Sequence, residues 1–457
     1  MQMMSSLGYL IMSEFTLVDK AAKLFELSSG CALHRDRDPV SGKCKVLPLG
    51  RWRGTLQQED ILYPYMKLCD TLEMVGVDLT ANWQASRRIN NDDLQSRVQR
   101  CIGAWKSGKF MPLVSRPFSI NTYCLSKVWF RAGSVDMRVG DITAITSRVK
   151  SYCYQDLYQK PSEVLLYRRE GEGGLGLYHL QSKALAHLIS KFIQTAANPK
   201  YIKSLFHTWL FRYHVLGELD LPNPGYTPYD NQSFVEVIKY GKEKTPLNPV
   251  SMSIKQWYRL LLEKNVIMRV VDQEDRMELI PCKVEDRQPE VVWPEVYRAS
   301  RLTGLSPECK SFLFQLVHPL LPSKERIHHL NPNTSPLCWC NSGAMETYQH
   351  LFFQCEINQE SGQALLRCVR TYDRTLSDIK LLRLELSTDE PFLLASVSLV
   401  SCGLKLIWES RKIKKRTSLF DMRAELESAI TIKRKSRLRK VREAGSIMKN
   451  MIENFLQ

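Results

Sequence analysis

The chain has 457 residues, of which 44% are hydrophobic and 25% charged, fractions ordinary for a folded globular protein. Its 64 Lys and Arg exceed its 48 Asp and Glu by 16, a surplus that favours a polyanionic partner and is shared by ribosomal, chromatin and membrane-surface proteins. The thirteen scattered cysteines exclude the dense, even disulfide framework of a small secreted domain and favour a reducing compartment.

Two stretches bear on targeting. Residues 1–10 lack the basic region and apolar core of a signal peptide. The longest apolar stretch, 392–408, contains three serines and Lys405, which predicts a buried helix and not a membrane span. We therefore expect an intracellular protein without a membrane partner.

Periodicity predicts a few short elements in the first third of the chain. Apolar residues recur at helical spacing over residues 15–27, and strand-like runs follow at 44–49 and 72–77. Two further helices are predicted at 118–131 and 139–152.

Between these segments, four apolar residues share one face of a predicted helix. They are Leu94, Val98, Ile102 and Trp105. Asn91 and Asp92 precede them and are candidate caps for the start of that helix.

The second half predicts mainly helices. A long helix is expected at 182–213, followed by a Pro-rich linker at 222–249 and a hairpin within 266–280. Helices dominate after Pro294, and the last is expected to run from 419 to about 455.

A cluster of metal-ligating residue types lies in the last third. Its members are Cys338, Cys340, His350 and Cys355. Thiolates and an imidazole suit tetrahedral zinc, and the four-residue gap between His350 and Cys355 occurs in many small zinc fingers. Only one residue separates Cys338 from Cys340, which would make a tight chelate. The alternative is that these are ordinary reduced cysteines beside an apolar helix.

Several stretches together carry a family resemblance. They are residues 29–34, 43–50 and 72–77, then Ser-Arg-Pro-Phe-Ser-Ile-Asn at 115–121 with 125–130, then Gly-Gly-Leu-Gly-Leu at 173–177, and finally the cysteine–histidine cluster. In this order, they resemble the part of a non-LTR (LINE-type) retrotransposon reverse transcriptase that lies downstream of its active site. The resemblance reads them as the palm end, the primer-grip strand, the thumb helix, the segment after the thumb, and the zinc knuckle.

The resemblance implies a mostly α fold with small β elements, divided into five regions. Residues 1–60 would be a remnant of the palm end, 61–155 the primer-grip strand and helical thumb, and 156–300 a helical middle region with a Pro-rich linker and hairpin. Residues 301–365 would form a zinc-knuckle-like module with structural zinc, and 366–457 a basic helical tail. Palm strands without their partners have open edges, so residues up to about 60 are expected to be poorly ordered or aggregation-prone.

Polymerase chemistry needs more than this sequence contains. A reverse transcriptase uses an aromatic-x-Asp-Asp turn between apolar strands, because two metal ions must bridge the incoming phosphates. The only adjacent aspartates are Asp92 and Asp93, and no apolar strand precedes them. We assign no catalytic residue, expect no magnesium, and do not expect this sequence to polymerise by itself, although it resembles RNA-directed DNA polymerases.

Candidate nucleic-acid contacts fall in two regions. In the thumb segment, Tyr123, Lys127 and Arg131 recur every four residues and would share one helix face, an arrangement that suits phosphate contacts. A solvated surface is the alternative. Weaker candidates in the same block are Arg51, Arg97, Arg100 and Arg116.

The tail has two cationic runs, which suit polyanion binding or nuclear import. Their candidate contacts are Lys412, Lys414, Lys415, Lys433, Arg434, Lys435 and Arg437. Because Glu425, Glu427 and Glu443 flank the second run, a solvated helix with ion pairs is the alternative. These runs favour the nucleus over the cytoplasm.

The sequence thus leads to two hypotheses. The first is a truncated, nucleic-acid-binding remnant of a LINE-type reverse transcriptase that holds RNA or an RNA–DNA duplex and works with a full-length, element-encoded polymerase. The second is a host-recruited scaffold whose basic tail docks to chromatin or other proteins.

Overall fold

The computed structural model describes most of the chain from residue 44 onward. The described residues are 20, 44–48, 54–61, 66–74, 77–80, 82–106, 111–132, 137–197, 241, 243–244, 251–267, 291–340, 342–386 and 390–453. They are mostly helical with two small sheets, so the expected mostly α fold with small β elements is confirmed.

The chain divides into two compact units. Unit 1 comprises residues 1–98, 127–145 and 184–234, and unit 2 comprises 99–126, 146–183 and 235–457. Several predictions fall wholly or mostly outside the described residues: the helix at 15–27 except residue 20, Arg51, the helix beyond 197, the linker at 222–249 except residues 241 and 243–244, and the state of most of residues 1–60.

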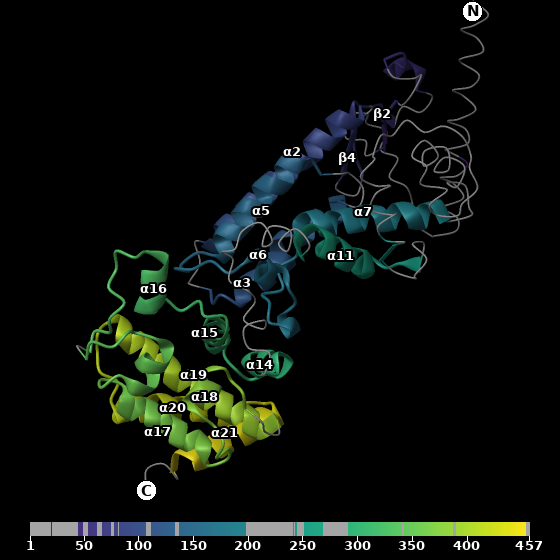
Figure 1. Ribbon diagram of the computed structural model, residues 1–457. Coiled ribbons are helices and arrows are strands. Elements are labelled where there is room, and N and C mark those ends of the chain that lie inside the picture. The colour runs from purple at the N-terminus through teal and green to yellow at the C-terminus, as the bar shows by residue number, and fades with distance from the viewer. Residues whose placement is uncertain are drawn as a thin grey trace, which may run out of the picture. The chain divides into compact units, whose positions relative to one another are not determined.

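The helices and strands run in the following order (Figure 1). They are β1 (Cys44–Val46), η2 (Gln58–Asp60), β2 (Met66–Leu68), β3 (Thr71–Met74), β4 (Val77–Thr80), α2 (Trp83–Lys106), α3 (Ser115–Ser119), η3 (Ile120–Cys124), α4 (Ser126–Ala132), α5 (Val139–Cys153), α6 (Glu163–Tyr167), η4 (Glu170–Glu172), α7 (Leu180–Ala197), α11 (Ile254–Leu262), η6 (Glu263–Ile267), α14 (Trp293–Ser300), α15 (Pro307–Val317), α16 (Lys324–Leu330), η7 (His350–Gln354), α17 (Gln359–Arg370), α18 (Asp378–Leu382), α19 (Glu390–Lys412), α20 (Leu419–Arg434) and α21 (Arg439–Glu453).

Unit 1 contains both sheets. β1 pairs in parallel with β2, whereas β3 pairs antiparallel with β4. The single strand predicted at 72–77 is wrong, because Met74 pairs with Val77 and the chain reverses between them. The two intervening residues include Gly76, and two-residue connections with glycine are common in hairpins.

Helix α2 confirms the predicted apolar face and corrects its start. Leu94, Val98 and Ile102 are buried, as the periodicity indicated. The helix begins at Trp83, about two turns before the expected caps, so that prediction is wrong. Asn82 caps it instead, because its side-chain oxygen accepts hydrogen bonds from the backbone N–H groups that follow, of Gln84 and Ala85.

The thumb-like segment has a feature that α-helical periodicity does not anticipate. The helix predicted at 118–131 consists of α3, the π-helical turn η3 and α4. The π-turn widens the ring closed by each hydrogen bond, as shown by Leu125 N–H donating to the carbonyl of Ile120. The helix predicted at 139–152 is α5 and is confirmed. The start of the hairpin predicted within 266–280 is wrong, because Val266 and Ile267 belong to the π-helical turn η6.

The glycines of residues 173–177 form a junction in unit 2. A Cβ on Gly173 would lie 2.5 Å from the Tyr297 ring of α14, so only glycine fits there. The Gly173 carbonyl faces His318 Nε2 at 2.8 Å, and the Gly174 carbonyl accepts a hydrogen bond from Arg301 at 3.0 Å. His318 and Arg301 end α15 and α14, so this loop anchors the helices that lead to the metal centre.

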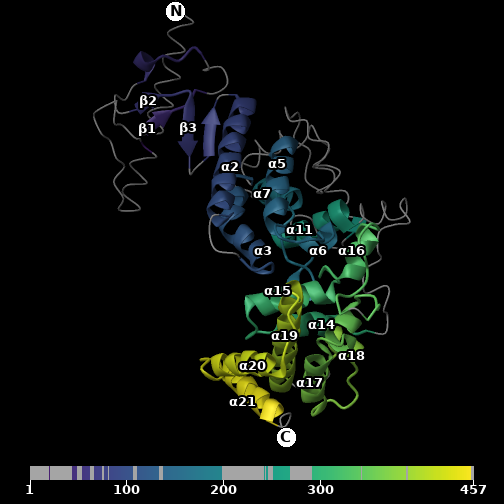
Figure 2. The same cartoon turned by 90° about the vertical axis from the view of Figure 1, so that its left-hand side faces the viewer.

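Helix α19 is the centre of the C-terminal core, as Figures 1 and 2 show. It contacts α15, α17, α20 and α21. Among the described residues it alone is long and apolar enough to cross a membrane, and most of its apolar window is buried inside the fold. Two of its serines are satisfied within the helix: Ser398 donates to the Leu394 carbonyl and Ser401 to the Ser398 carbonyl. The buried helix predicted at 392–408 is therefore found.

The single long helix predicted at 419–455 is wrong, because the chain breaks between α20 and α21. Arg442 donates hydrogen bonds to the carbonyls of Ser436 and Arg437 in the intervening turn, which satisfies acceptors that a continuous helix would use itself. The helices pack closely where a Cβ on Gly445 would lie 3.0 Å from atoms of Arg434 (Figure 2). The tail is thus a helical hairpin.

Two glycines test the tightness of this packing. A Cβ on Gly362 of α17 would lie 1.8 Å from the Phe352 carbonyl oxygen in η7, whereas one on Gly103 of α2 would meet nothing within 4 Å. We expect Gly362→Ala to lower the free energy of unfolding by about 2–3 kcal/mol through overpacking. The matched change Gly103→Ala should raise it by about 0.5–1 kcal/mol through helix propensity. Urea unfolding measures both, and equal effects would contradict the packing described.

Candidate metal centre

The four predicted ligands meet at one point in unit 2. Cys338 Sγ lies 3.8 Å from Cys355 Sγ, and Cys340 Sγ lies 3.4 Å from His350 Nε2. All four ligand atoms lie within 4.8 Å of one another. A tetrahedral zinc with bonds of about 2.3 Å to sulfur and 2.0 Å to nitrogen would separate two sulfurs by about 3.8 Å and a sulfur from a nitrogen by about 3.5 Å. These two distances match the separations that one zinc ion requires, and the other ligand atoms lie close enough to share it.

A tight loop brings the first two cysteines to this point. An isolated bridge joins Leu337 to Met345, and the Cys338 N–H donates to the Ala344 carbonyl at 2.8 Å. Gly343 adopts a left-handed φ of 72°, which favours glycine in this turn. The loop is short enough that both thiols face the same point, although only one residue separates them.

A π-helical turn presents the other two ligands. In η7 the Cys355 N–H donates to the His350 carbonyl at 2.6 Å. A hydrogen bond between residues five apart places them one above the other on the same side of the turn. The four-residue gap between His350 and Cys355 therefore suits this turn. In a regular α-helix, residues five apart do not share a hydrogen bond.

Burial and hydrogen bonds shift the pKa values of the three thiols in different directions. Burial raises the pKa of Cys338 to about 12 and raises the pKa of Cys355 as well. Burial also raises the pKa of Cys340, but hydrogen bonds with Ser342 and His350 outweigh it and bring that pKa down to about 6. Metal binding requires thiolates, and a bound dication stabilises them in such a pocket.

The donor set fits structural zinc. Cys338, His350 and Cys355 are buried and Cys340 is half-buried, so the four donors form a closed site. Three soft thiolates with one imidazole are a zinc-binding set that leaves no position open for a substrate. Within the described part of the chain, no other group of three or more such residues converges in this way. The cluster is compatible with structural zinc.

A buried ion pair joins the metal centre to the C-terminal helices. Glu346, which lies between the two ligand pairs, is fully buried and accepts hydrogen bonds from the Lys324 N–H at the start of α16 and from the Arg411 guanidinium. Arg411 stands in the last turn of α19, where its guanidinium covers the Trp408 ring at 4.7 Å. Residue types alone gave no sign of this link, because an acidic residue in a polar loop is ordinarily exposed.

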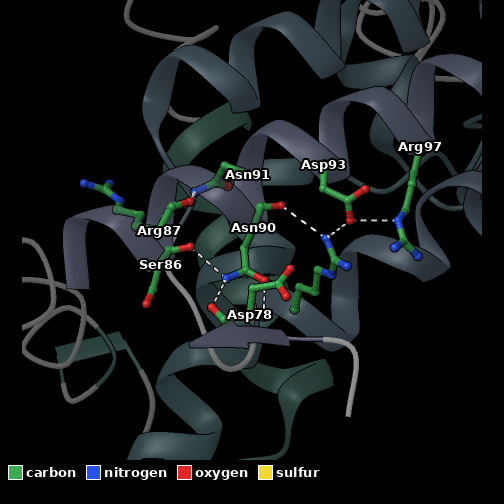
Figure 3. A network of polar contacts seen from close by, with 8 residues as sticks. Asp78, Ser86, Arg87, Asn90, Asn91, Asp93 and Arg97 are labelled. Atoms are coloured by element: carbon green, nitrogen blue, oxygen red, sulfur yellow. Dashed lines mark hydrogen bonds and ion pairs between the residues drawn. The ribbon is translucent and has the colours of Figure 1, made fainter. Parts of the chain in front are cut away.

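In unit 1, two of the predicted nucleic-acid contacts share one carboxylate (Figure 3). Asp93 Oδ2 lies 2.5 Å from Arg131 and 2.8 Å from Arg97. Arg131 also donates to the Asn90 carbonyl and is only 7% exposed. The exposed stripe predicted for Tyr123, Lys127 and Arg131 is therefore wrong. Its third member is buried, whereas the other two are exposed.

The same network anchors the β3–β4 hairpin (Figure 3). The buried Asn90 side chain accepts from the Asp78 N–H at 3.0 Å and donates to the carbonyls of Asp78 and Ser86. The adjacent Asp92 pairs with Arg138. Asp92 and Asp93, both in the interior of α2, thus pair with cations, and Asp92 does not cap the helix as predicted.

Two further predicted contacts are structural cations in unit 2. Arg116 is buried and donates to the carbonyls of Met111, Cys153 and Gln155, and burial lowers the pKa of its guanidinium. Lys433 is buried and donates to the Gly304 carbonyl at 2.6 Å, and burial lowers its pKa too. Both side chains are enclosed and already donate hydrogen bonds, so neither is exposed for a phosphate contact in this fold.

The remaining tail candidates are exposed and differ in their partners. Lys412 pairs with Glu409, and Lys415 with Asp421. Within the described part of the chain, Lys414, Arg434, Lys435 and Arg437 make no ion pair. Arg100 is exposed as well.

Comparison with known proteins relates the metal centre to one family. A family model described as zinc-binding in reverse transcriptase matches residues 284–361, which include all four ligands and helices α14 to α16. No curated protein matches the chain. The matched region is therefore related to reverse transcriptases.

Replacing one ligand should empty the metal centre. We expect the purified protein to contain about one zinc per chain, and Cys355→Ser to reduce this to near zero because a structural site needs all four ligands. Cys368→Ser is the matched control, since Cys368 is another buried thiol outside the cluster. Metal analysis by mass spectrometry measures both, and parent protein without zinc would contradict the assignment.

Breaking the buried ion pair should be costly. Arg411→Met leaves the enclosed Glu346 carboxylate without its cation, and we expect it to lower the free energy of unfolding by about 3–5 kcal/mol. Lys412→Met is the control, because its pair with Glu409 is exposed and should contribute at most about 0.5 kcal/mol. Chemical denaturation of the two variants compares them, and similar midpoints would refute the role given to Glu346.

Proposed function

We propose that this chain binds RNA or an RNA–DNA duplex as the palm-end, thumb and zinc-knuckle part of a LINE-type reverse transcriptase. The match to a reverse-transcriptase zinc-binding family supports the last of these regions directly. The order of the preceding stretches, with Gly-Gly-Leu-Gly-Leu at 173–177 before the metal centre, supports the rest. Such proteins grip nucleic acid mainly through its phosphates.

The observation that carries the binding function is a set of unneutralised cations on the helical hairpin of the tail. Arg434, Lys435 and Arg437 surround the turn between α20 and α21 and are exposed. Arg442 braces this turn by donating hydrogen bonds to two of its carbonyls. A hydrogen-bonded turn that displays three cations without ion pairs suits contacts with a phosphate backbone, and these charges contribute little to the stability of the fold.

The metal centre is linked to the cationic turn of the tail through Glu346, Arg411 and the connection at 412–417. Zinc would fix the loop at residues 338–355, and Glu346 in that loop holds Arg411 at the end of α19. The cationic connection at 412–417 follows directly and leads into α20. In this proposal the zinc is structural, and the tail is the part that contacts phosphates.

The proposed role is binding without catalysis by the residues present. The only adjacent aspartates are Asp92 and Asp93 of α2, and they pair with Arg138 and with Arg97 and Arg131, so we do not assign them to magnesium. Synthesis would require a palm from a full-length, element-encoded polymerase. The cationic runs of the tail also favour a location in the nucleus.

Removing the three unpaired cations should weaken RNA binding. We expect the triple variant Arg434→Ala, Lys435→Ala, Arg437→Ala to lose roughly tenfold or more in affinity for a labelled single-stranded RNA. The slope of log affinity against log salt should fall by about 2, because three phosphate contacts are lost. Fluorescence anisotropy at several salt concentrations measures both quantities.

A second triple variant controls for net charge. Arg423→Ala, Arg439→Ala, Lys449→Ala removes the same number of charges from exposed ion pairs on α20 and α21 and should change affinity far less. Equal losses in the two variants would mean that only net charge matters. Parent protein that binds neither RNA nor DNA in dilute salt, but captures chromatin proteins, would favour the scaffold hypothesis instead.

A further inference from the structure

A second pair of thiols lies in unit 2, apart from the metal centre. Cys101 belongs to α2, and Cys124 is the last residue of the π-helical turn η3. Their sulfur atoms are 2.9 Å apart, closer than the roughly 3.5–4.0 Å at which non-bonded heavy atoms settle. Only a small further approach separates this geometry from a disulfide of about 2.05 Å.

The surroundings of this pair differ from those of the metal centre. No third Cys, His, Asp or Glu side chain of the described residues completes a metal-binding group with Cys101 and Cys124. The chemistry open to two adjacent thiols without further ligands is oxidation to a disulfide.

The two thiols differ in access to solvent. Cys124 is fully buried, whereas Cys101 is half-buried, with exposed Arg100 and Gly103 next to it on α2. A dissolved oxidant therefore reaches the Cys101 thiol first, while the Cys124 thiol next to it stays protected by burial. Redox-sensitive proteins commonly combine an accessible thiol with a neighbouring resolving thiol in this way.

We propose that Cys101 and Cys124 are an oxidation-sensitive pair that a hydroperoxide converts to a disulfide. Cys101 sulfur attacks one peroxide oxygen, the O–O bond breaks, and the products are a sulfenic acid and water (or an alcohol). The Cys124 thiol then attacks the Cys101 sulfur. The S–O bond breaks, the S–S bond forms and a second water leaves, so two thiols are oxidised by one peroxide.

The disulfide would change the turn that carries Tyr123. The Cys101 thiol donates to the Tyr123 carbonyl at 3.6 Å, and the Tyr123 ring packs on Trp105 of α2 at a centroid distance of 5.4 Å. Oxidation removes that donor and replaces it with a covalent link between α2 and η3. Because Tyr123 is half-exposed, the link would restrain an aromatic side chain on the surface. This inference stands independently of nucleic-acid binding.

Peptide mapping of the full chain tests the pair directly. Trypsin releases Cys101 in residues 101–106 and Cys124 in residues 110–127, because Pro117 blocks cleavage after Arg116. After brief treatment with hydrogen peroxide and alkylation of the remaining thiols, we expect these two peptides to be joined. Dithiothreitol should separate them. Separate peptides, each alkylated or over-oxidised, would overturn the proposal.

Cysteine variants give a second test of the Cys101–Cys124 pair, with a control for the effect of replacing a buried thiol. Cys101→Ser should abolish the linked peptide, whereas Cys153→Ser, which removes a buried thiol outside the pair, should leave it. In Cys124→Ala, Cys101 should stop at the sulfenic acid and be trapped by dimedone, which should not label the parent at that position. Dimedone labelling of Cys101 in the parent to the same extent would refute Cys124 as the resolving thiol.

Discussion

The buried carboxylate of Glu346 is the constraint on which the C-terminal half depends. Enclosing a carboxylate costs several kcal/mol unless a cation and hydrogen-bond donors replace the lost water. Here the guanidinium of Arg411 and the Lys324 N–H both donate to Oε1 of Glu346, and each comes from a different helix. Oε2 is buried and has no hydrogen-bond partner among the described residues. The carboxylate therefore holds α16 and α19 against the metal-binding loop. Without bound zinc, the loop would hold Glu346 less firmly opposite Arg411. Without the ion pair, the loop would hold the four zinc ligands less firmly in place.

The cations of the chain fall into two groups, those that are buried and hydrogen-bonded and those that are exposed, and only the exposed group is available to a partner. Arg116, Arg131 and Lys433 are enclosed, and carbonyls or a carboxylate use their donors. Planar guanidinium groups with five donors suit this purpose, since one Arg can satisfy several carbonyls at helix ends. These three are not exposed for contact with a polyanion, whereas Arg100 and Lys127 and most of the tail candidates are exposed. A net charge of +16 thus overstates the binding surface, and the position of each cation decides its use.

Sequence patterns predicted what depends on local chemistry and missed what depends on tertiary contacts. The apolar stripe of α2 and the four zinc ligands follow from periodicity and residue type, and the structure brings each set together. The π-helical turns η3 and η7 were not predictable, because no residue preference marks them. Arg131 was expected at the surface since its periodicity fits a helix face, but Asp93, 38 residues away in the sequence, draws it inward. The extent of α2 was missed because its first turns are polar and carry no apolar repeat.

The metal centre and the Cys101–Cys124 pair each depend on a π-helical turn, and the sulfur–sulfur distances that result suit different chemistry. In η7 the turn sets Cys355 3.8 Å from Cys338 with an imidazole nearby, a spacing that keeps sulfurs apart and leaves room for an ion between them. In η3 the turn sets Cys124 2.9 Å from Cys101 with no further ligand, a spacing that leaves no such room. Thiolates bound to a metal are shielded from oxidants by the bond they already make, whereas an adjacent pair of thiols outside a metal site is not. The same residue type on the same kind of turn is thereby directed to metal binding in one place and to oxidation in the other.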